Sequence, residues 1–367
     1  MKRICQICSV LPPGGDAVGE GAIKLKRLLG KNDFYCCILT SSDQQPGNDI
    51  LNIIDNWSLF QIIKSIRIIK KKEIDIIYFH YPTPYYKRKL VITFIPLIFR
   101  IFGFATVTYL HEYHNYSLLG KLRILPILIF SDRIVTSDTP NFNSINELIG
   151  KYKRIIFASV GSNFSDEFIL KNKTNKTQFI GLTNSKINLL YFGFIMEGKG
   201  LETMIELSES KEFTSHFIFT IAGGLPEIMS FRSKEIYSKV KSSKNINYLG
   251  FITNDKLSEI FAKTDAVILP FNDGVTERRG SFLTCMALGK AVVTTQPKVS
   301  FPGLINLQNV LFLENLSKEE VLRKVEYIRS ISRSKLKEIG NAAHDWYMQN
   351  FSEKIFVDKI ISVINSL

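Results

Sequence analysis

Short apolar runs alternate with longer segments of mixed polarity along the whole chain. Each run has the length of a buried strand, and the mixed segments have the length of helices with one apolar side. Strands that alternate with helices form βα units, and the strands of such units lie parallel in one sheet. The pattern therefore predicts an α/β fold with parallel sheets.

The apolar runs fall into two groups, one in each half of the chain. In the first half the expected strands lie in RICQICSV, FYCCILT, IDIIYFH, TVTYLHE, DRIVTS and RIIFASV. In the second half they lie in INLLYFGF, HFIFTIAGG, INYLGF, AVILPF and AVVTT, and the clearest helices lie in GLETMIELSES and NDKLSEIFAKT. The repetition predicts two Rossmann-like domains.

A polar segment with few apolar anchors, residues 170–186, is the expected linker. The first domain then covers residues 1–169, on the acceptor side in the function considered below, and the second covers residues 187–345. The segment SEKIFVDKIISVINSL has apolar residues at helical spacing. We expect a C-terminal helix within residues 346–367, which could pack back toward the first domain.

The cysteine content argues against a disulfide framework, because five cysteines are an odd number in a chain of 367 residues. Cys5 and Cys8 have Cys-x-x-Cys spacing, but no second Cys/His pair has zinc spacing. We interpret both, with Cys36, Cys37 and Cys285, as core residues. Because no signal peptide is recognisable either, we expect a cytoplasmic protein.

Most of the net charge of +13 comes from the first half of the chain. Its basic clusters at residues 70–72, 87–89 and 151–154 could face nucleic acid, an anionic membrane surface or solvent. They lack interleaved aromatic residues on a recognisable module, so no specific nucleic-acid partner is expected.

Residues 90–110 carry one charge, Arg100, over a length that could cross a bilayer. Pro96, Arg100 and Gly103 divide the stretch, so we expect a helix in LVITFIPLIFRIFG and a strand in FATVTYL; a transmembrane span is the less favoured alternative. This very apolar helix could lie at a membrane interface or be buried. The interfacial alternative predicts a peripheral protein at the inner face of the plasma membrane.

Three loops at expected strand ends suit an anionic ligand, because open parallel sheets bind ligands at the carboxyl ends of their strands. LPPGGDAVGEG offers Gly14 and Gly15 at a helix start. YFGFIMEGKGLETM places Lys199 just before a helix, where free amides favour a phosphate. NDGVTERRGSFLTCMALG places Arg278 and Arg279 at another helix start, where amides and two guanidinium groups would form a diphosphate clamp.

These pieces resemble the retaining glycosyltransferases of family four over nearly the whole chain. LPPGGDAVGEG resembles the amino-terminal glycine loop, VTYLHEY the strand that ends in a histidine, and LLYFGFIMEGKGLETMIE the lysine-bearing loop of the second domain. FTIAGG, NINYLGFITNDKLSEIFAKTDAVILPF and the small-residue helix before GKAVVTT follow in the family's order. The resemblance implies the GT-B fold, with two Rossmann-like domains facing a central cleft, and a nucleotide-diphosphate sugar as donor, a UDP- or GDP-sugar being favoured.

The chain also departs from the family pattern. Most members carry an arginine after the glycine that matches Gly193, where this chain has Phe194. The family's Glu-x7-Glu pair falls on Thr276 and Thr284, with Glu277 one residue from the first position. A subset with the motif DGV-x-x-RRGS is similar to this sequence. We infer that the arginine pair supplies the positive charge that the phenylalanine cannot.

The resemblance implies roles for individual residues. His111 would contact the donor sugar, although a histidine satisfied within the core is the alternative; His80 would face the acceptor. The catalytic candidates are His111, Lys199, Arg278, Arg279 and Glu277, the donor-binding candidates are Gly14, Gly15, Gly223, Gly224, Phe251, Gly280 and Ser281, and the acceptor-side candidates are His80, Asp16, Glu20 and Glu112. The sequence contains no Asp-x-Asp, so neither a metal nor a separate cofactor is expected.

The expected function is transfer of a hexose from a nucleotide diphosphate to a cell-surface glycan intermediate, such as one of lipopolysaccharide or capsule, that is linked to lipid. Cations and helix amides would stabilise the negative charge on the leaving phosphate. Retention of configuration is implied by the resemblance. Two alternatives stay open: a sugar-nucleotide epimerase or hydrolase of the same architecture, and a catalytically silent, membrane-associated partner of a transferase.

Overall fold

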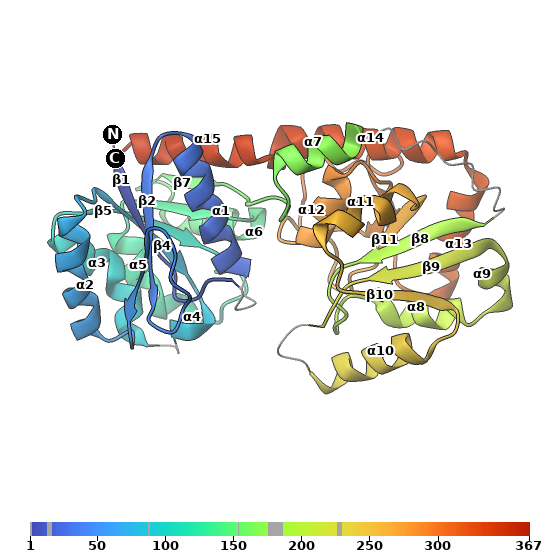
Figure 1. The fold of residues 1–367 in the computed structure, drawn as a ribbon, viewed down its shortest axis with the longest axis horizontal. Helices are drawn as coiled ribbons and strands as arrows, with labels where there is room; N and C mark the ends of the chain where they lie inside the picture. The colour runs from blue at the N-terminus through green and yellow to red at the C-terminus, as the bar shows by residue number, and fades with distance from the viewer. Residues whose placement is uncertain (1, 13–16, 87–88, 153, 175–185, 226–229) are drawn as a thin grey trace. The chain divides into compact units, whose positions relative to one another are not determined.

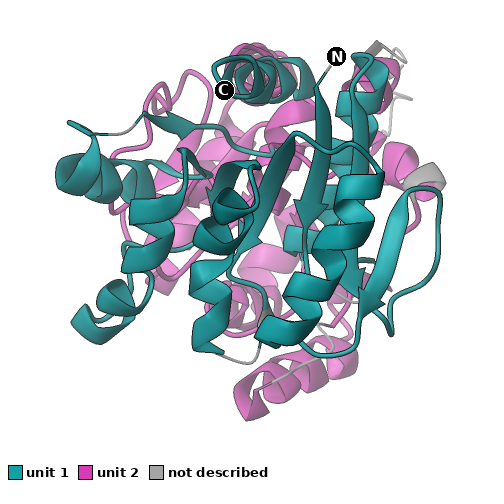
Figure 2. Cartoon of the chain, turned by 90° about the vertical axis from the view of Figure 1, so that its left-hand side faces the viewer, with its two compact units in different colours: residues 1–160, 353–367 teal, residues 161–352 magenta. Residues whose placement is uncertain are grey.

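The computed structural model describes residues 2–12, 17–86, 89–152, 154–174, 186–225 and 230–367. Two compact units, each built on its own parallel β-sheet, make up the chain (Figure 1). Unit 1 contains residues 1–160 and 353–367, and unit 2 contains residues 161–352 (Figure 2). The predicted α/β fold with two parallel-sheet, Rossmann-like domains is confirmed.

The sheet of unit 1 has seven parallel strands in the order β3-β2-β1-β4-β5-β6-β7. The strands are β1 (Arg3–Ile7), β2 (Tyr35–Ser41), β3 (Ile50–Ile54), β4 (Ile76–Tyr81), β5 (Ala105–Leu110), β6 (Arg133–Thr136) and β7 (Ile155–Phe157). The strand order reverses between β1 and β4. This position is the topological switch point of the sheet, where open α/β sheets bind their ligands.

Helices cover both faces of this sheet. They are α1 (Ala17–Lys31), α2 (Leu59–Lys71), η1 (Pro84–Tyr86), η2 (Leu90–Phe94), α3 (Ile95–Ile101), α4 (Leu118–Arg123), α5 (Leu125–Phe130), α6 (Thr139–Ile149) and α15 (Glu353–Asn365). Because successive strand residues point to opposite faces, β1 sends Ile4 to one apolar cluster and Cys5 to the other. The first cluster is closed by α1 and α15, and the second by α2, α3, α5 and α6.

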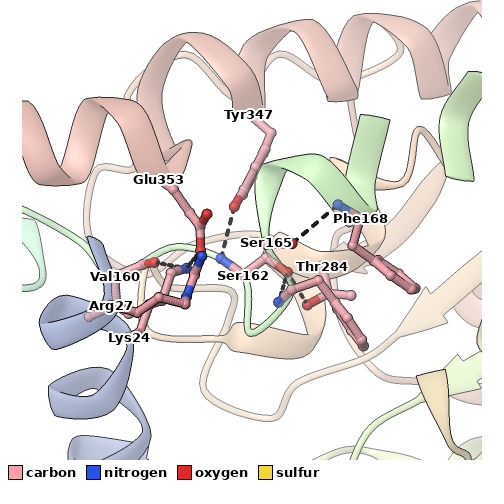
Figure 3. A network of polar contacts seen from close by, with 10 residues as sticks. Lys24, Arg27, Val160, Ser162, Ser165, Phe168, Thr284, Tyr347 and Glu353 are labelled. Atoms are coloured by element: carbon pink, nitrogen blue, oxygen red, sulfur yellow. Dashed lines mark hydrogen bonds and ion pairs between the residues drawn. The ribbon is translucent and has the colours of Figure 1, made fainter. Parts of the chain in front are cut away.

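The last helix completes the core of unit 1. Phe356 and Ile360 of α15 belong to the same buried cluster as Leu25 of α1. At the start of α15 the buried Glu353 forms ion pairs with Lys24, at 3.6 Å, and with Arg27 (Figure 3). The C-terminal segment therefore supplies one wall of the core that the N-terminal residues begin.

The unit boundaries differ from the domain boundaries that the sequence suggested. Unit 1 ends at residue 160 rather than 169, because α7 (Asp166–Thr174) belongs to unit 2. This helix also includes the first five residues of the expected linker; residues 175–185 lie outside the described part. The helix expected within residues 346–367 is α15, which begins directly after an extended Ser352 that ends α14 (Arg333–Phe351).

Unit 2 has a six-stranded parallel sheet in the order β10-β9-β8-β11-β12-β13, which reverses between β8 and β11. The strands are β8 (Ile187–Phe192), β9 (Phe217–Ala222), β10 (Ile246–Gly250), β11 (Ala266–Leu269), β12 (Val292–Thr295) and β13 (Leu311–Leu313). Besides α7 and α14, the helices are α8 (Leu201–Ser208), α9 (Lys211–His216), α10 (Phe231–Ser242), α11 (Asn254–Ala262), α12 (Gly280–Ala287) and α13 (Lys318–Ser330).

All eleven predicted strands are present, and the two that the sequence reading missed, β3 and β13, are short strands at sheet edges. The five cysteines are free and buried, as predicted. The apolar segment expected as a helix before β5 is the 3-10 turn η2 followed by α3, and its Ile92, Ile95 and Phe99 lie in the core of unit 1. Within the described residues, no helix combines the length and apolar character needed to span a membrane.

Candidate functional site

The candidate site of unit 2 lies at its switch point, where the chain leaves β8 and β11. Glycines allow the loops there to approach closely. A Cβ at Gly200 would lie 1.8 Å from the carbonyl oxygen of Pro270, and a Cβ at Gly223 would lie 1.7 Å from that of Gly193. Both distances are far below van der Waals contact, so no other residue fits without moving backbone. The predicted Gly223 is thus required by packing between strand ends.

Two cations meet at the aromatic ring of Phe271, a fully buried residue just after β11. The Lys199 ammonium lies 5.1 Å from the ring centroid, and the Arg279 guanidinium carbon lies 4.7 Å from it. Cations are attracted to the face of an aromatic ring within about 6 Å. The structure thereby brings together Lys199 and Arg279, two predicted residues that are far apart in sequence.

The surroundings of Lys199 destabilise its charge. The pKa of this lysine is lowered from its ordinary value of 10.5 to about 8, mainly by burial and next by the nearby positive charge of Arg279, whereas Asp273 acts in the opposite direction. A buried cation beside another cation favours an anionic ligand, because such a ligand offsets both the desolvation and the repulsion.

The two neighbouring arginines differ in environment. Arg279 forms an ion pair with Asp273, and its Nε atom is buried without a hydrogen-bond partner among the described residues. The side chain of Arg278 is exposed. The two arginines of the expected clamp therefore lie in different surroundings: the Arg279 guanidinium is at the ring of Phe271 with Lys199, and the side chain of Arg278 is exposed.

The small-residue helix α12 begins directly after these arginines. Arg279 is its N-cap residue, but the side chain makes no capping hydrogen bond. The amide of Gly280 donates to the carbonyl oxygen of Arg278 at 3.1 Å, so this predicted donor is engaged within the turn. Ser281 is half-buried and close to Gly193, where an added Cβ would come within 3.3 Å of the serine Cβ.

The positions of the family's glutamate pair hold different chemistry here. Glu277 is buried, with 4% of its surface exposed. Thr284 is also buried, and its hydroxyl pairs with that of Ser162 at 2.9 Å, while Tyr347 accepts from the Ser162 amide at 2.9 Å (Figure 3). Thr284 is thus a packing residue in the interior of unit 2.

The remaining donor-side candidates of unit 2 lie at the ends of β8, β9 and β10. Gly224 accepts a hydrogen bond from the Ile195 amide at 3.0 Å and lies beside Phe251, whose side chain is 80% exposed. Phe194, in the place of the family's arginine, is half-exposed. Exposed aromatic rings at this edge are suited to stacking on a planar group.

The switch point of unit 1 is lined by a second polar group. The Ser9 and Thr83 hydroxyls form a short hydrogen bond between the loops that follow β1 and β4. His80 of β4 is buried and pairs with Gln6 of β1 at 2.8 Å and with His111, after β5, at 3.4 Å. His111 itself is half-buried. The structure brings the two predicted histidines together, and His80, the residue expected on the acceptor side, is 1% exposed.

Other predicted acceptor-side residues are less constrained. Glu20 is exposed on α1, and Glu112 is half-buried after β5. Gly14, Gly15 and Asp16 lie outside the described residues. Within the described residues, no group of three or more histidine, cysteine or acidic side chains gathers as a metal site.

The sequence reading did not single out Gln6, Phe271 or Asp273. Gln6 had a usable signal, since it is a lone amide within an apolar strand and a buried amide needs partners. Phe271 and Asp273 had none, because an aromatic residue after a strand and an acid in a turn are ordinary.

Comparisons with known proteins agree with this geometry. Residues 186–328 match the family model described as glycosyl transferases group 1. A glycosyltransferase from Rickettsia africae has a similar structure, with a TM-score of 0.72 at 18% identity over 99% of this chain and 97% of that chain. Sucrose-phosphate synthase from Thermosynechococcus elongatus has a TM-score of 0.71 at 13% identity, covering 100% and 99% of the two chains.

A third similar structure is that of Anabaena HepE in complex with UDP-glucose, with a TM-score of 0.69 at 14% identity over 100% of both chains. Comparison with curated protein sequences gives no match. The chain thus has the GT-B fold, defined by its two parallel-sheet units.

Proposed function

We propose that this protein is a retaining glycosyltransferase that binds the diphosphate of a nucleotide sugar at the switch point of unit 2. The observation that carries the proposal is the placement of Lys199 and Arg279 at the Phe271 ring. The pair leaves an excess of positive charge beside the start of α12, and a diphosphate supplies the matching negative charge. The UDP-glucose complex of the similar HepE structure supports a nucleotide sugar as the ligand.

The proposed chemistry follows from charge development. When the bond between sugar and diphosphate breaks, negative charge builds on the leaving phosphate, and cations already in place stabilise it. Lys199 and Arg279 have this role, and Arg278 can add charge from solvent once a ligand is bound. The departing phosphate takes the proton of the attacking hydroxyl on the same face of the sugar, so configuration is retained. His111 contacts the donor sugar.

The proposed donor is a UDP- or GDP-hexose, and the acceptor is a lipid-linked glycan intermediate at the inner face of the plasma membrane. Helix α4 of unit 1 supports membrane contact. None of its residues is buried; Leu118, Leu119 and Leu122 are 75%, 79% and 56% exposed, and Lys121 and Arg123 lie among them. Apolar side chains interleaved with cations favour an anionic membrane interface.

Nucleotide binding tests the donor site. We expect Arg279→Ala and Lys199→Ala each to weaken UDP or GDP binding by about 1.5–3 kcal/mol, the contribution of a charge-assisted hydrogen bond. Arg278→Ala should have a smaller effect, because that side chain is exposed. Calorimetry of each variant checks this, with Lys263→Ala on the exposed surface of unit 2 as the matched control. Unchanged affinity in both the Arg279 and Lys199 variants would contradict the proposed donor site.

Transfer assays separate the proposal from its alternatives. Incubation with nucleotide sugars and a lipid-linked acceptor should release nucleoside diphosphate and form a glycoside with the donor's anomeric configuration, read by NMR. An inverted product would refute retention. Donor binding without hydrolysis or transfer would identify a silent partner, and epimerised or hydrolysed donor would identify the other alternative.

Vesicle binding tests the membrane contact. The combined change of Leu118, Leu119 and Leu122 to serine should reduce co-sedimentation with anionic vesicles by about tenfold or more, since each buried leucine side chain contributes roughly 1.5–3 kcal/mol. Serine at Leu249, an exposed leucine of unit 2, is the control. If the wild-type protein does not co-sediment with such vesicles at low salt, the membrane part of the proposal is wrong.

A further inference from the structure

A line of hydrogen bonds runs across the central strands of unit 1. It links His111 to two buried residues, Gln6 and His80, that have no role in the chemistry proposed above. Gln6, His80 and His111 belong to β1, β4 and the end of β5, which are neighbours in the sheet. Gln6 and His80 are fully buried, with 0% and 1% exposure. A buried polar pair in an apolar sheet is costly unless its hydrogen bonds are satisfied, so the bonds it makes are informative.

The donor and acceptor of each hydrogen bond follow from the contacts of Gln6. Gln6 Nε2 lies 3.0 Å from the carbonyl oxygen of Ala22, which can only accept, so this nitrogen is the donor. Gln6 Oε1 is therefore the atom that faces His80 Nε2 at 2.8 Å. An amide oxygen can only accept, and His80 Nε2 must carry a proton.

His80 is held in the neutral form. Burial lowers its pKa from 6.5 to about 3, and the titratable groups around it are Tyr78, Tyr109 and, through Gln6, the buried Cys36. Burial raises the pKa of Tyr78 and of Cys36, so neither supplies a negative charge near neutral pH. A neutral ring with a proton on Nε2 has a bare Nδ1, which can only accept.

The bare nitrogen of His80 faces His111. The distance from His80 Nδ1 to His111 Nε2 is 3.4 Å, and the two rings are stacked with an interplanar angle of 14°. For a hydrogen bond to exist here, His111 Nε2 must donate. We propose that Gln6 and His80 are positioning residues that hold the His111 ring with a proton on Nε2, directed at His80.

The effect on catalysis that we infer from the position of this proton rests on the proposed function. In that function His111 contacts the sugar, and the hydrogen bond from its Nε2 to His80 fixes the orientation of the ring that makes this contact. The backbone of His111 is fixed as well, since its amide donates to Tyr81 at 2.8 Å.

The tautomer can be measured on the wild-type protein without any substrate. NMR of protein with ¹⁵N-labelled histidine distinguishes a protonated from a bare ring nitrogen, and single-histidine variants assign the signals. At neutral pH we expect Nε2–H with bare Nδ1 for His80, and a protonated Nε2 for His111. A His111 ring with a bare Nε2, or one that exchanges between tautomers, would overturn the proposal even if nucleotide binding is as proposed.

Two substitutions at His80 separate positioning from packing. Asparagine places its amide near the site of Nδ1 and keeps an acceptor for His111, whereas glutamine reaches the site of Nε2 and removes that acceptor. His80→Asn should keep the His111 tautomer and nearly normal kcat. His80→Gln should give mixed tautomers and lower kcat by about tenfold, the equivalent of one net hydrogen bond.

The control is His114→Asn, because His114 is an exposed histidine of the same unit bonded to Ser144. It should leave the His111 signals and kcat unchanged. Equal loss of activity in both His80 variants, with the His111 tautomer unaltered, would show that His80 serves packing alone. Expected tautomers with no sugar transfer at all would instead count against the proposed function.

Discussion

At the residue scale, the donor site is defined by a cation that the fold does not fully compensate. Lys199 is held beside the Arg279 guanidinium and the ring of Phe271, and burial lowers its pKa to about 8. A lysine that has lost part of its hydration destabilises the folded state whenever it is charged. The charged Lys199 therefore lowers the stability of the folded state, and the same charge allows the site to bind an anion.

Replacing this lysine should stabilise the protein while removing nucleotide affinity. Below pH 8 the side chain is charged in both the folded and unfolded states, so Lys199→Met removes the desolvation cost and should raise the free energy of unfolding by about 1–2 kcal/mol. Between pH 8 and 10.5 the folded state loses its proton first, the penalty falls, and the advantage of the variant should disappear. Urea unfolding of wild type and variant at pH 7 and pH 10 measures the difference. A variant that is less stable at pH 7 would contradict the argument.

At the element scale, close approach between strand ends decides where glycine is needed. The carbonyl oxygen of Gly193 occupies the space of a Cβ at Gly223, and these residues follow the adjacent strands β8 and β9. In α1, by contrast, nothing lies within 4 Å of a Cβ added at Gly30. Alanine is therefore expected to lower the stability at Gly223 and to raise it at Gly30.

Alanine at these two glycines tests the packing of the site. Gly223→Ala should destabilise unit 2 by about 3 kcal/mol or more and weaken nucleotide binding, because the strand ends must separate. Gly30→Ala should stabilise by about 0.5–1 kcal/mol, since alanine has the higher helix propensity. Thermal unfolding and UDP titration measure both. If Gly223→Ala keeps wild-type stability and affinity, the close contact does not shape the site.

At the scale of the whole molecule, the chain closes its first unit with its last helix. Ile360 of α15 is fully buried against the core that β1 and α1 begin. Unit 1 is therefore incomplete until residues from both ends of the sequence have met, whereas unit 2 is built from one continuous segment.

This topology predicts which part of the chain a C-terminal substitution destabilises. Ile360→Ala should cost about 2–5 kcal/mol, as for other buried isoleucines, and its effect should fall on unit 1. Ile328→Ala, at a fully buried position of α13 in unit 2, is the matched change. Hydrogen exchange should show lost protection mainly in residues 3–157 for the first variant and in residues 187–351 for the second. Equal loss in both units for Ile360→Ala would argue that the units unfold together.

Much of the fold was predictable because its determinants are local. Runs such as IDIIYFH and AVILPF have the apolar composition of strands buried on both faces, and the helices between them carry their own spacing of apolar residues. The edge strands β3 and β13 were not predicted because polar residues flank them on both sides, in NDILNIIDN and QNVLFLENL. The boundary at residue 160 escaped it because a charged segment that resembled a linker forms α7.

By itself the sequence determined the two parallel sheets, the loops at their carboxyl ends and the candidate cations Lys199 and Arg279. Only the tertiary structure decided that Arg279 lies against Phe271 while Arg278 faces solvent, and that His80 is buried between Gln6 and His111. The physical reason is that strand and helix patterns depend on neighbours in sequence, whereas charge pairing and hydrogen-bond direction depend on the order of strands in the sheet. Contacts across a switch point join residues that are distant in sequence, so the local sequence around either residue does not predict the contact.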